Sequence, residues 1–199
     1  MAKINRRYID KHWLVFLIRG TIAAVFGSFA LFRGPVGMED TVAIIGVFLL
    51  FMGIVDSVGA LYCSTKKHGW INAIIDALVD VVAAIALLFV ARDNLTNSVV
   101  IISIYTIVSG IIDIFHGFVS TVDPTDCFIR ILAGVCGCII GTVILNAGEF
   151  EVTTFIRFFG TYMLIVGVTS LIYGVHNRSQ NIEDKIARMQ SYKKKKSKK

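Results

Sequence analysis

The stretch 13–32, WLVFLIRGTIAAVFGSFALF, decides the fold because the chain carries two further copies of it at equal spacing. Residues 70–89 read WINAIIDALVDVVAAIALLF, and residues 127–146 read CFIRILAGVCGCIIGTVILN. The copies are 57 residues apart, and small residues fall on the same positions of each. Self-similarity at a fixed period is the signature of a repeat architecture, so the chain is built from three copies of one unit.

Each unit holds two apolar stretches of the length that a helix needs to cross a hydrocarbon core roughly 30 Å thick. The six stretches are residues 13–32, 42–62, 71–90, 99–119, 128–145 and 155–175. A soluble bundle needs a polar face on each surface helix, whereas 83–90 and 99–104 are apolar on every side. The 55% share of apolar residues and the mean hydropathy of +0.72 agree. We therefore predict an all-α integral membrane protein with six transmembrane helices in three helical hairpins.

Units that each cross the membrane twice all enter it from the same side. Repeats of like topology are related by an axis along the membrane normal, so we expect pseudo-threefold symmetry about that axis. The predicted parts are a cytoplasmic N-terminus (1–12), a membrane domain (13–175, with repeats at about 13–69, 70–126 and 127–175) and a basic cytoplasmic tail (176–199).

Lysine and arginine collect on one side of the predicted membrane. They lie before residue 12, at Lys66 and Lys67 in the second loop, and in the tail that contains residues 193–196. Basic residues near membrane spans stay on the cytoplasmic side, so both termini are expected in the cytoplasm of a cell with this protein in its inner membrane.

Small residues recur every seven positions along each predicted helix. The six columns are Gly20, Gly27 and Gly34; Ala77, Ala84 and Ala91; Gly134, Gly141 and Gly148; Gly46, Gly53 and Ala60; Ser103, Gly110 and Gly117; Gly160, Gly167 and Gly174. Lipid gives helices no hydrophobic reason to associate, so close backbone approach along such stripes is the expected source of packing energy. A sustained seven-residue period favours left-handed crossing.

A family resemblance follows from the same positions. Trp13, Arg19-Gly20, Gly27 and Pro35, followed by Gly46 and Gly53-Ile54, resemble the short membrane repeat of the HdeD family, whose founding member is a bacterial acid-resistance membrane protein. The resemblance covers roughly residues 12–175 and implies a role in acid stress, with no catalytic residues to carry over. Only the first unit keeps the Arg-Gly pair, because the second has Asp76-Ala77 at those positions.

Ionisable residues inside the apolar stretches are the candidate functional site, because each costs roughly 2.5–3.5 kcal/mol to insert. Arg19, Asp56, Asp76 and Asp113 are expected in one layer about 9 Å from the cytoplasmic boundary, at 1.5 Å of rise per residue. Asp80 is expected one turn deeper than Asp76, on the same helical face, while His116 and Arg130 are expected nearer the cytoplasm. The third unit has Ala133 and Ser170 at the aligned positions, which breaks the ring.

Two interpretations of this layer stay open. In the structural one, Arg19 pairs with an aspartate from another hairpin, and the remaining acids bond to hydroxyl groups. The hydroxyl candidates are Ser57, Ser103, Thr106 and Ser109. In the functional one, Asp56, Asp76, Asp80 and Asp113 line a cavity open to the cytoplasm that exchanges protons or binds a cation, because intramembrane ionisable groups are functional by default.

Other classes of function find little support. The sequence has no nucleophile with a base, no phosphate loop and no metal-ligand spacing, so we expect neither an enzyme nor a cofactor or metal site. His116 is expected at the headgroups rather than as a pH sensor. The expected partners are the bilayer, anionic headgroups for the basic tail and a possible second copy of the chain, but no nucleic acid. The alternative function is a small transporter or channel for protons, cations or a minor solute.

Overall fold

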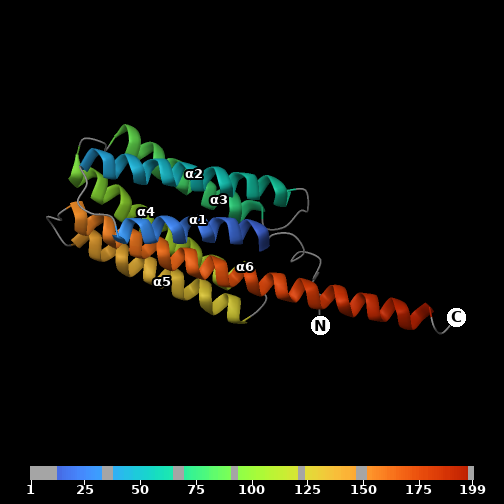
Figure 1. Cartoon of the computed structure of the whole chain (residues 1–199). Coiled ribbons are helices and arrows are strands. Elements are labelled where there is room, and N and C mark those ends of the chain that lie inside the picture. Colours follow the sequence, from blue (N-terminus) through green and yellow to red (C-terminus); the bar gives the residue numbers. More distant parts are fainter. Residues whose placement is uncertain are drawn as a thin grey trace.

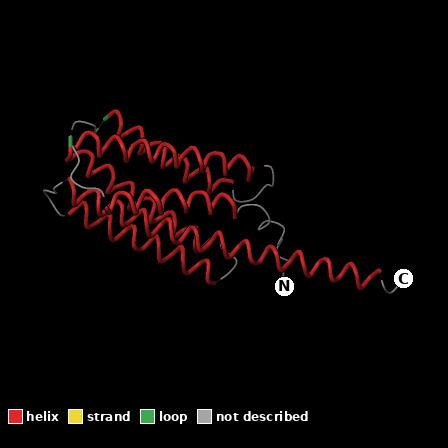
Figure 2. The backbone as a smooth tube through the Cα atoms, viewed as in Figure 1, coloured by secondary structure: helices red, strands yellow, loops and turns green. Residues whose placement is uncertain are grey.

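The computed structural model describes residues 13–32, 38–64, 70–90, 94–120, 124–146 and 152–196. These form helices, and no strand lies among them (Figure 2). The helices are α1 (Trp13–Phe32), α2 (Met38–Ser64), α3 (Trp70–Phe89), α4 (Leu95–Ser120), α5 (Pro124–Asn146) and α6 (Val152–Lys196). The all-helical fold expected from the sequence is therefore confirmed, with one helix over each predicted stretch.

Local signals set where two of these helices begin. The side-chain Oδ1 of Asn94 accepts a hydrogen bond from the backbone nitrogen of Asn97 at 3.3 Å, which caps the first turn of α4. α5 begins at Pro124, where a missing N–H costs nothing because the first amides of a helix lack intrahelical partners.

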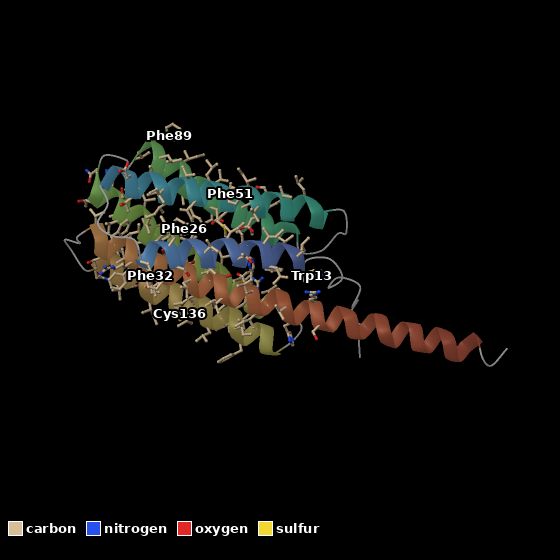
Figure 3. The ribbon with its side chains drawn as sticks, in the orientation of Figure 1. Trp13, Phe26, Phe32, Phe51, Phe89 and Cys136 are labelled. Carbon is tan, nitrogen blue, oxygen red and sulfur yellow. The ribbon has the colours of Figure 1, made fainter. Side chains whose placement is uncertain are left out.

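Five stretches of the described chain are long and apolar enough to cross a membrane. They are Trp13–Phe32, Asp40–Leu61, Thr96–Val119, Cys127–Asn146 and Thr154–His176. Large apolar side chains cover the outside of the bundle, and Phe89 is 82% exposed. Figure 3 shows Phe89 pointing away from the helices, whereas Phe26 lies inside and stacks on Phe48 with ring centroids 3.8 Å apart. The chain is therefore a multi-pass membrane protein. A sixth crossing by α3 stays a prediction.

The closest helix packing joins neighbouring units rather than the two helices of one unit. α2 packs against α3, α4 against α5, and α6 against α1, each far more extensively than the two helices within a unit contact each other. Figure 1 shows α1 alongside α6 and α2 alongside α3. The predicted hairpins are thus correct in chain order, but they are not the main packing units.

The small-residue stripes account for this pairing. A Cβ placed on Gly110 would lie 2.6 Å from the backbone oxygen of Gly134, and one on Gly20 would lie 2.9 Å from that of Gly167. A Cβ on Gly53 would lie 3.3 Å from the backbone oxygen of Ala77. These three contacts occupy aligned positions, so the predicted close approach along the stripes is confirmed.

Along the helix axes, one half of the bundle is apolar and the other half is charged. The apolar core gathers where α1, α3 and α5 end and where α2, α4 and α6 begin. Its largest buried side chains include Ile45, Leu49, Leu87, Ile102, Ile144, Phe155 and Phe159. The six charged residues Arg19, Asp56, Asp76, Asp80, Asp113 and Arg130 lie in the other half, nearer the end where α1 begins.

The last helix extends well beyond the bundle. α6 continues from its apolar stretch to Lys196, and its final part projects alone from the end at which α1 begins (Figure 1). At the base of this extension, the guanidinium carbon of Arg178 lies 5.2 Å from the ring centroid of Trp13.

Candidate functional site

Arg19 stands at the centre of the charged half. Its Nη1 lies 3.2 Å from Oδ2 of Asp56 on α2 and 3.5 Å from Oδ2 of Asp76 on α3, to which it donates a hydrogen bond. The nearest carboxylate is the one in its own unit, which was not expected. The expected pairing with an aspartate from another hairpin is also present, through Asp76. Arg19 and Asp76 are aligned positions of the first and second units, so the structure brings equivalent residues together.

Asp80 lies on the same helix as Asp76 but is much more deeply buried, with 2% of its surface exposed. Its Oδ1 accepts a hydrogen bond from the hydroxyl group of Tyr105 on α4 at 2.9 Å, while its Oδ2 has no hydrogen-bond partner among the described residues. Tyr105 is not among the residues predicted from the sequence. The repeat contains a signal for it, because the offset aligns Tyr105 with Phe48 and Tyr162, so each unit has an aromatic ring there.

Asp113 pairs with a second guanidinium group. Its Oδ1 lies 3.8 Å from Nη1 of Arg130 on α5. The Arg130 guanidinium carbon also lies 5.1 Å from the ring centroid of Phe16 and 4.8 Å from that of Tyr173. Arg130 aligns with Phe16 and Ala73, so only the third unit supplies a cation at this position. Arg130, rather than Arg19, is therefore the ion-pair partner of Asp113.

His116 is a second correction. It was expected at the headgroups, yet 3% of its surface is exposed, and its Nδ1 lies 3.9 Å from Oδ1 of Asp76. This side chain of α4 points into the bundle, where it packs beside the carboxylate of Asp76. His116 therefore belongs to the charged cluster.

The hydroxyl groups proposed as partners for the acids are used elsewhere. Ser57, Ser103 and Thr106 each donate to the backbone oxygen four residues earlier in their own helix, at 2.7 Å in every case. Such bonds satisfy a hydroxyl group locally when no water is present. Ser109 instead accepts a hydrogen bond from Tyr162 at 3.0 Å.

A cavity of about 30 Å³ opens beside Arg19 and Asp113. It also borders Arg130 and Tyr173, together with Ala133 and Ser170, the two residues that break the ring. A water molecule needs roughly 10–15 Å³, so this cavity has room for one. The short side chains of the third unit thus leave space where the other units place charged side chains.

Charge is unbalanced in this part of the protein. Among the described residues, four carboxylates, on Asp56, Asp76, Asp80 and Asp113, lie in this half with two guanidinium groups, those of Arg19 and Arg130. We call these six residues with His116 the charged cluster. Unpaired ionised carboxylates inside a protein are very costly, so an excess of carboxylates over cations favours protonation or a bound cation. Among the described residues, no group of three or more His, Cys, Asp and Glu could hold a metal ion.

Some predicted features lie outside the described residues. These are the N-terminus (1–12) and the loops at 33–37, 65–69, 91–93, 121–123 and 147–151, which contain most of the charges used to orient the chain. The side chains of the basic tail after residue 180 are also outside them.

Comparison with family models agrees with the repeat. A model described as "Short repeat of unknown function (DUF308)" matches residues 18–89, 75–146 and 132–189. Its matches begin at 18, 75 and 132, which is the 57-residue spacing found in the sequence. The chain belongs to this family. The short-repeat family includes HdeD-like membrane proteins. Searches of curated proteins and of solved structures gave no match.

Proposed function

We propose that this short-repeat protein is a non-catalytic, HdeD-like protein of the inner membrane that takes up protons in its charged cluster during acid stress. The observation that carries the proposal is the excess of four carboxylates, two buried and two half-buried, over two guanidinium groups. Acidification supplies the protons that such an excess requires, and intramembrane ionisable groups are functional by default.

In this proposal the chain crosses the membrane six times, with pseudo-threefold symmetry about the membrane normal. Two features support it. The three aligned contacts Gly20 to Gly167, Gly53 to Ala77 and Gly110 to Gly134 link the units in a closed ring. Arg19 also meets its own aligned residue, Asp76, and equivalent residues meet only near a common axis.

The charged half faces the cytoplasm in this proposal. Helix α1 begins at that end, and the cavity beside Asp113 gives water a place next to the carboxylates. The apolar half then faces outward and closes the bundle with side chains such as Leu49, Leu87 and Phe159. This closure favours proton binding from one side over the alternative, a transporter or channel for protons, cations or a minor solute.

Proton uptake tests the function directly. The purified full-length protein is taken from pH 7 to pH 4 with a pH indicator, beside a variant in which Asp56, Asp76, Asp80 and Asp113 are all Asn. The wild type should bind more protons than the variant. The control is Asp40→Asn, which removes an exposed carboxylate on α2 and should leave proton uptake by the charged cluster unchanged. The quadruple variant should also lose acid-stress protection in cells. Full protection by the quadruple variant would disprove the proposal.

Flux measurements separate the two candidate functions. Sealed vesicles that contain the protein should show no proton or cation flux between pH 4 and pH 7. Sustained flux that the quadruple variant lacks would favour the transporter.

Orientation has its own test. Cysteines placed near Asp40, Asn94 and Glu149 should react with an impermeant thiol reagent from outside intact cells, and cysteines near Lys66, Thr125 and the tail should not. Outside reactivity at Lys66 would reverse the proposed orientation.

The basic tail is proposed to touch anionic headgroups, and it fits that role only under one condition. Residues 193–196 lie 17 or more positions past His176, where the apolar stretch ends, which is about 25 Å along a straight helix. Attraction to anionic lipid falls off within a Debye length, about 8–10 Å. Contact with headgroups therefore requires the α6 extension to bend toward the membrane.

A further inference from the structure

Two carboxyl groups of the charged cluster face each other across the α2–α3 contact. Asp56 is 4% exposed and Asp80 is 2% exposed, so neither carboxyl group is open to bulk water. The two side chains lie within hydrogen-bonding range of each other. The close approach of Gly53 to Ala77, one turn from each aspartate, holds them there.

Each of these groups has an oxygen without a hydrogen-bond donor. Oδ2 of Asp80 has no partner among the described residues, since Tyr105 donates to Oδ1 alone. Oδ2 of Asp56 lies 3.2 Å from Nη1 of Arg19, but the contact lacks the alignment of a hydrogen bond. A buried acceptor left without a donor costs about 1–3 kcal/mol, and more when it is charged.

A single proton resolves both problems. Two ionised carboxylates in contact repel each other strongly where the dielectric constant is low, so one of them takes up a proton. The resulting O–H group donates to the remaining carboxylate, as in the paired aspartates of aspartic proteases. A divalent cation such as Ca²⁺ would need six to eight oxygen ligands, which two carboxylates and one phenol do not supply.

We propose that Asp56 and Asp80 share one proton, held as a carboxylic acid on one residue that donates a hydrogen bond to the carboxylate of the other. The pair then carries one negative charge, which Arg19 balances. The inference deepens the proposed function, on which it rests for its biological role, by naming the groups that hold a proton.

The surroundings fit this assignment. The ionisable groups that interact with the pair are Arg19 on α1, Asp76 on α3, Asp113 and Tyr105 on α4 and Arg130 on α5. Arg130 balances Asp113, and His116 lies beside Asp76. Arg19 is shared by Asp56 and Asp76, and among the described residues neither guanidinium group forms an ion pair with Asp80, so Asp80 adds negative charge beside Asp56.

Infrared spectroscopy of the full-length protein in lipid at neutral pH tests the shared proton. A protonated carboxyl group gives a C=O band separate from that of a carboxylate, and ¹³C-labelled aspartate shifts the band if it comes from Asp. The wild type should show this band. Asp56→Asn and Asp80→Asn should each abolish it, because the remaining carboxylate keeps a partner in Arg19 or Tyr105 and ionises. Asp113→Asn, Asp76→Asn and Asp40→Asn should leave it at full intensity.

Three results would overturn the inference: no band in the wild type, a band that survives in both Asp56→Asn and Asp80→Asn, or a band that disappears when sodium replaces choline in the buffer, which would indicate a bound cation. Tyr105→Phe covers the case in which Asp80→Asn fails to fold, since it should keep the band and shift its frequency. The band reports the proton whether or not the protein protects cells from acid. A band that behaves as expected in a protein without protection or uptake would leave the inference standing and the proposed function disproved.

Discussion

The charged cluster has two unlike sides. On the side built by the first two units, Arg19, Asp56 and Asp76 meet within 3.5 Å, and neither Asp56 nor Asp76 lines the cavity. On the side built with the third unit, the aligned positions hold Ala133 and Ser170, and the cavity opens there. One divergent copy is enough to give an otherwise packed charged layer a place for water.

The second cation follows from the same divergence. Arg130 occupies a position where the first unit has Phe16 and the second has Ala73, and it pairs with the carboxylate that Arg19 does not reach. A single substitution in one unit can therefore place a charge in the cluster, while the helix packing stays the same in all three units.

Removal of an arginine should give the largest difference in stability between the two sides of the charged cluster. Arg19→Ala leaves two buried carboxylates without their cation and should lower the free energy of unfolding by about 3–5 kcal/mol. Arg130→Ala should cost only about 1–2 kcal/mol, since the cavity lets water reach Asp113 and the loss is mainly that of two cation–π contacts. Denaturation in detergent, followed by circular dichroism, measures both.

The Arg19 result has an internal control. Asp56→Asn and Asp76→Asn introduced together should restore much of the stability lost in Arg19→Ala, because they remove the stranded charges. Equal losses for Arg19→Ala and Arg130→Ala would mean that the two sides of the cluster do not differ.

Added volume should also separate the two sides, with a smaller effect. Ala77→Val inserts two methyl groups where α2 and α3 approach most closely and should cost about 1–3 kcal/mol. Ala133→Val extends into the cavity and should cost less than about 1 kcal/mol. Thermal unfolding of the two variants compares them. A larger loss for Ala133→Val would show that the space beside it is not available.

A third carboxylate that completes the ring of charged residues should have the smallest effect on stability. Ser170→Asp places a third carboxylate at the position aligned with Asp56 and Asp113, next to the cavity and both arginines, and should change stability by less than about 1 kcal/mol. Met163→Asp, two turns away in the apolar half, should cost roughly 2.5–3.5 kcal/mol. Unfolding midpoints of the two variants give the comparison, and similar losses would contradict it.

Much of the fold could be predicted because the relevant signals are local or periodic. Apolar length gave the helices, and the spacing of small residues gave the stripes that touch at Gly20, Gly53 and Gly110. The choice of partner could not be read from the stripes, since a glycine shows that a helix comes close but not which helix it meets. The ring of contacts between units, closed by α6 on α1, needed the structure.

The candidate site divides in the same way. The sequence marked every ionisable residue of the charged cluster, because charge inside an apolar stretch is conspicuous. It did not assign Asp56 as the nearest partner of Arg19, Arg130 as the partner of Asp113, or Tyr105 as the donor to Asp80. Pairing depends on which side chains point into the same space.

The sequence by itself determined a membrane protein of three like units, the positions of its charges within the apolar stretches and the unit that breaks the pattern, since length, hydropathy and a 57-residue spacing are properties of the chain alone. Only the tertiary structure decided that units pack on their neighbours, that His116 is buried and that Ala133 and Ser170 leave a cavity. The physical reason is that periodicity fixes which face of a helix is small or charged, whereas contacts depend on the rotation and approach of helices far apart in the chain.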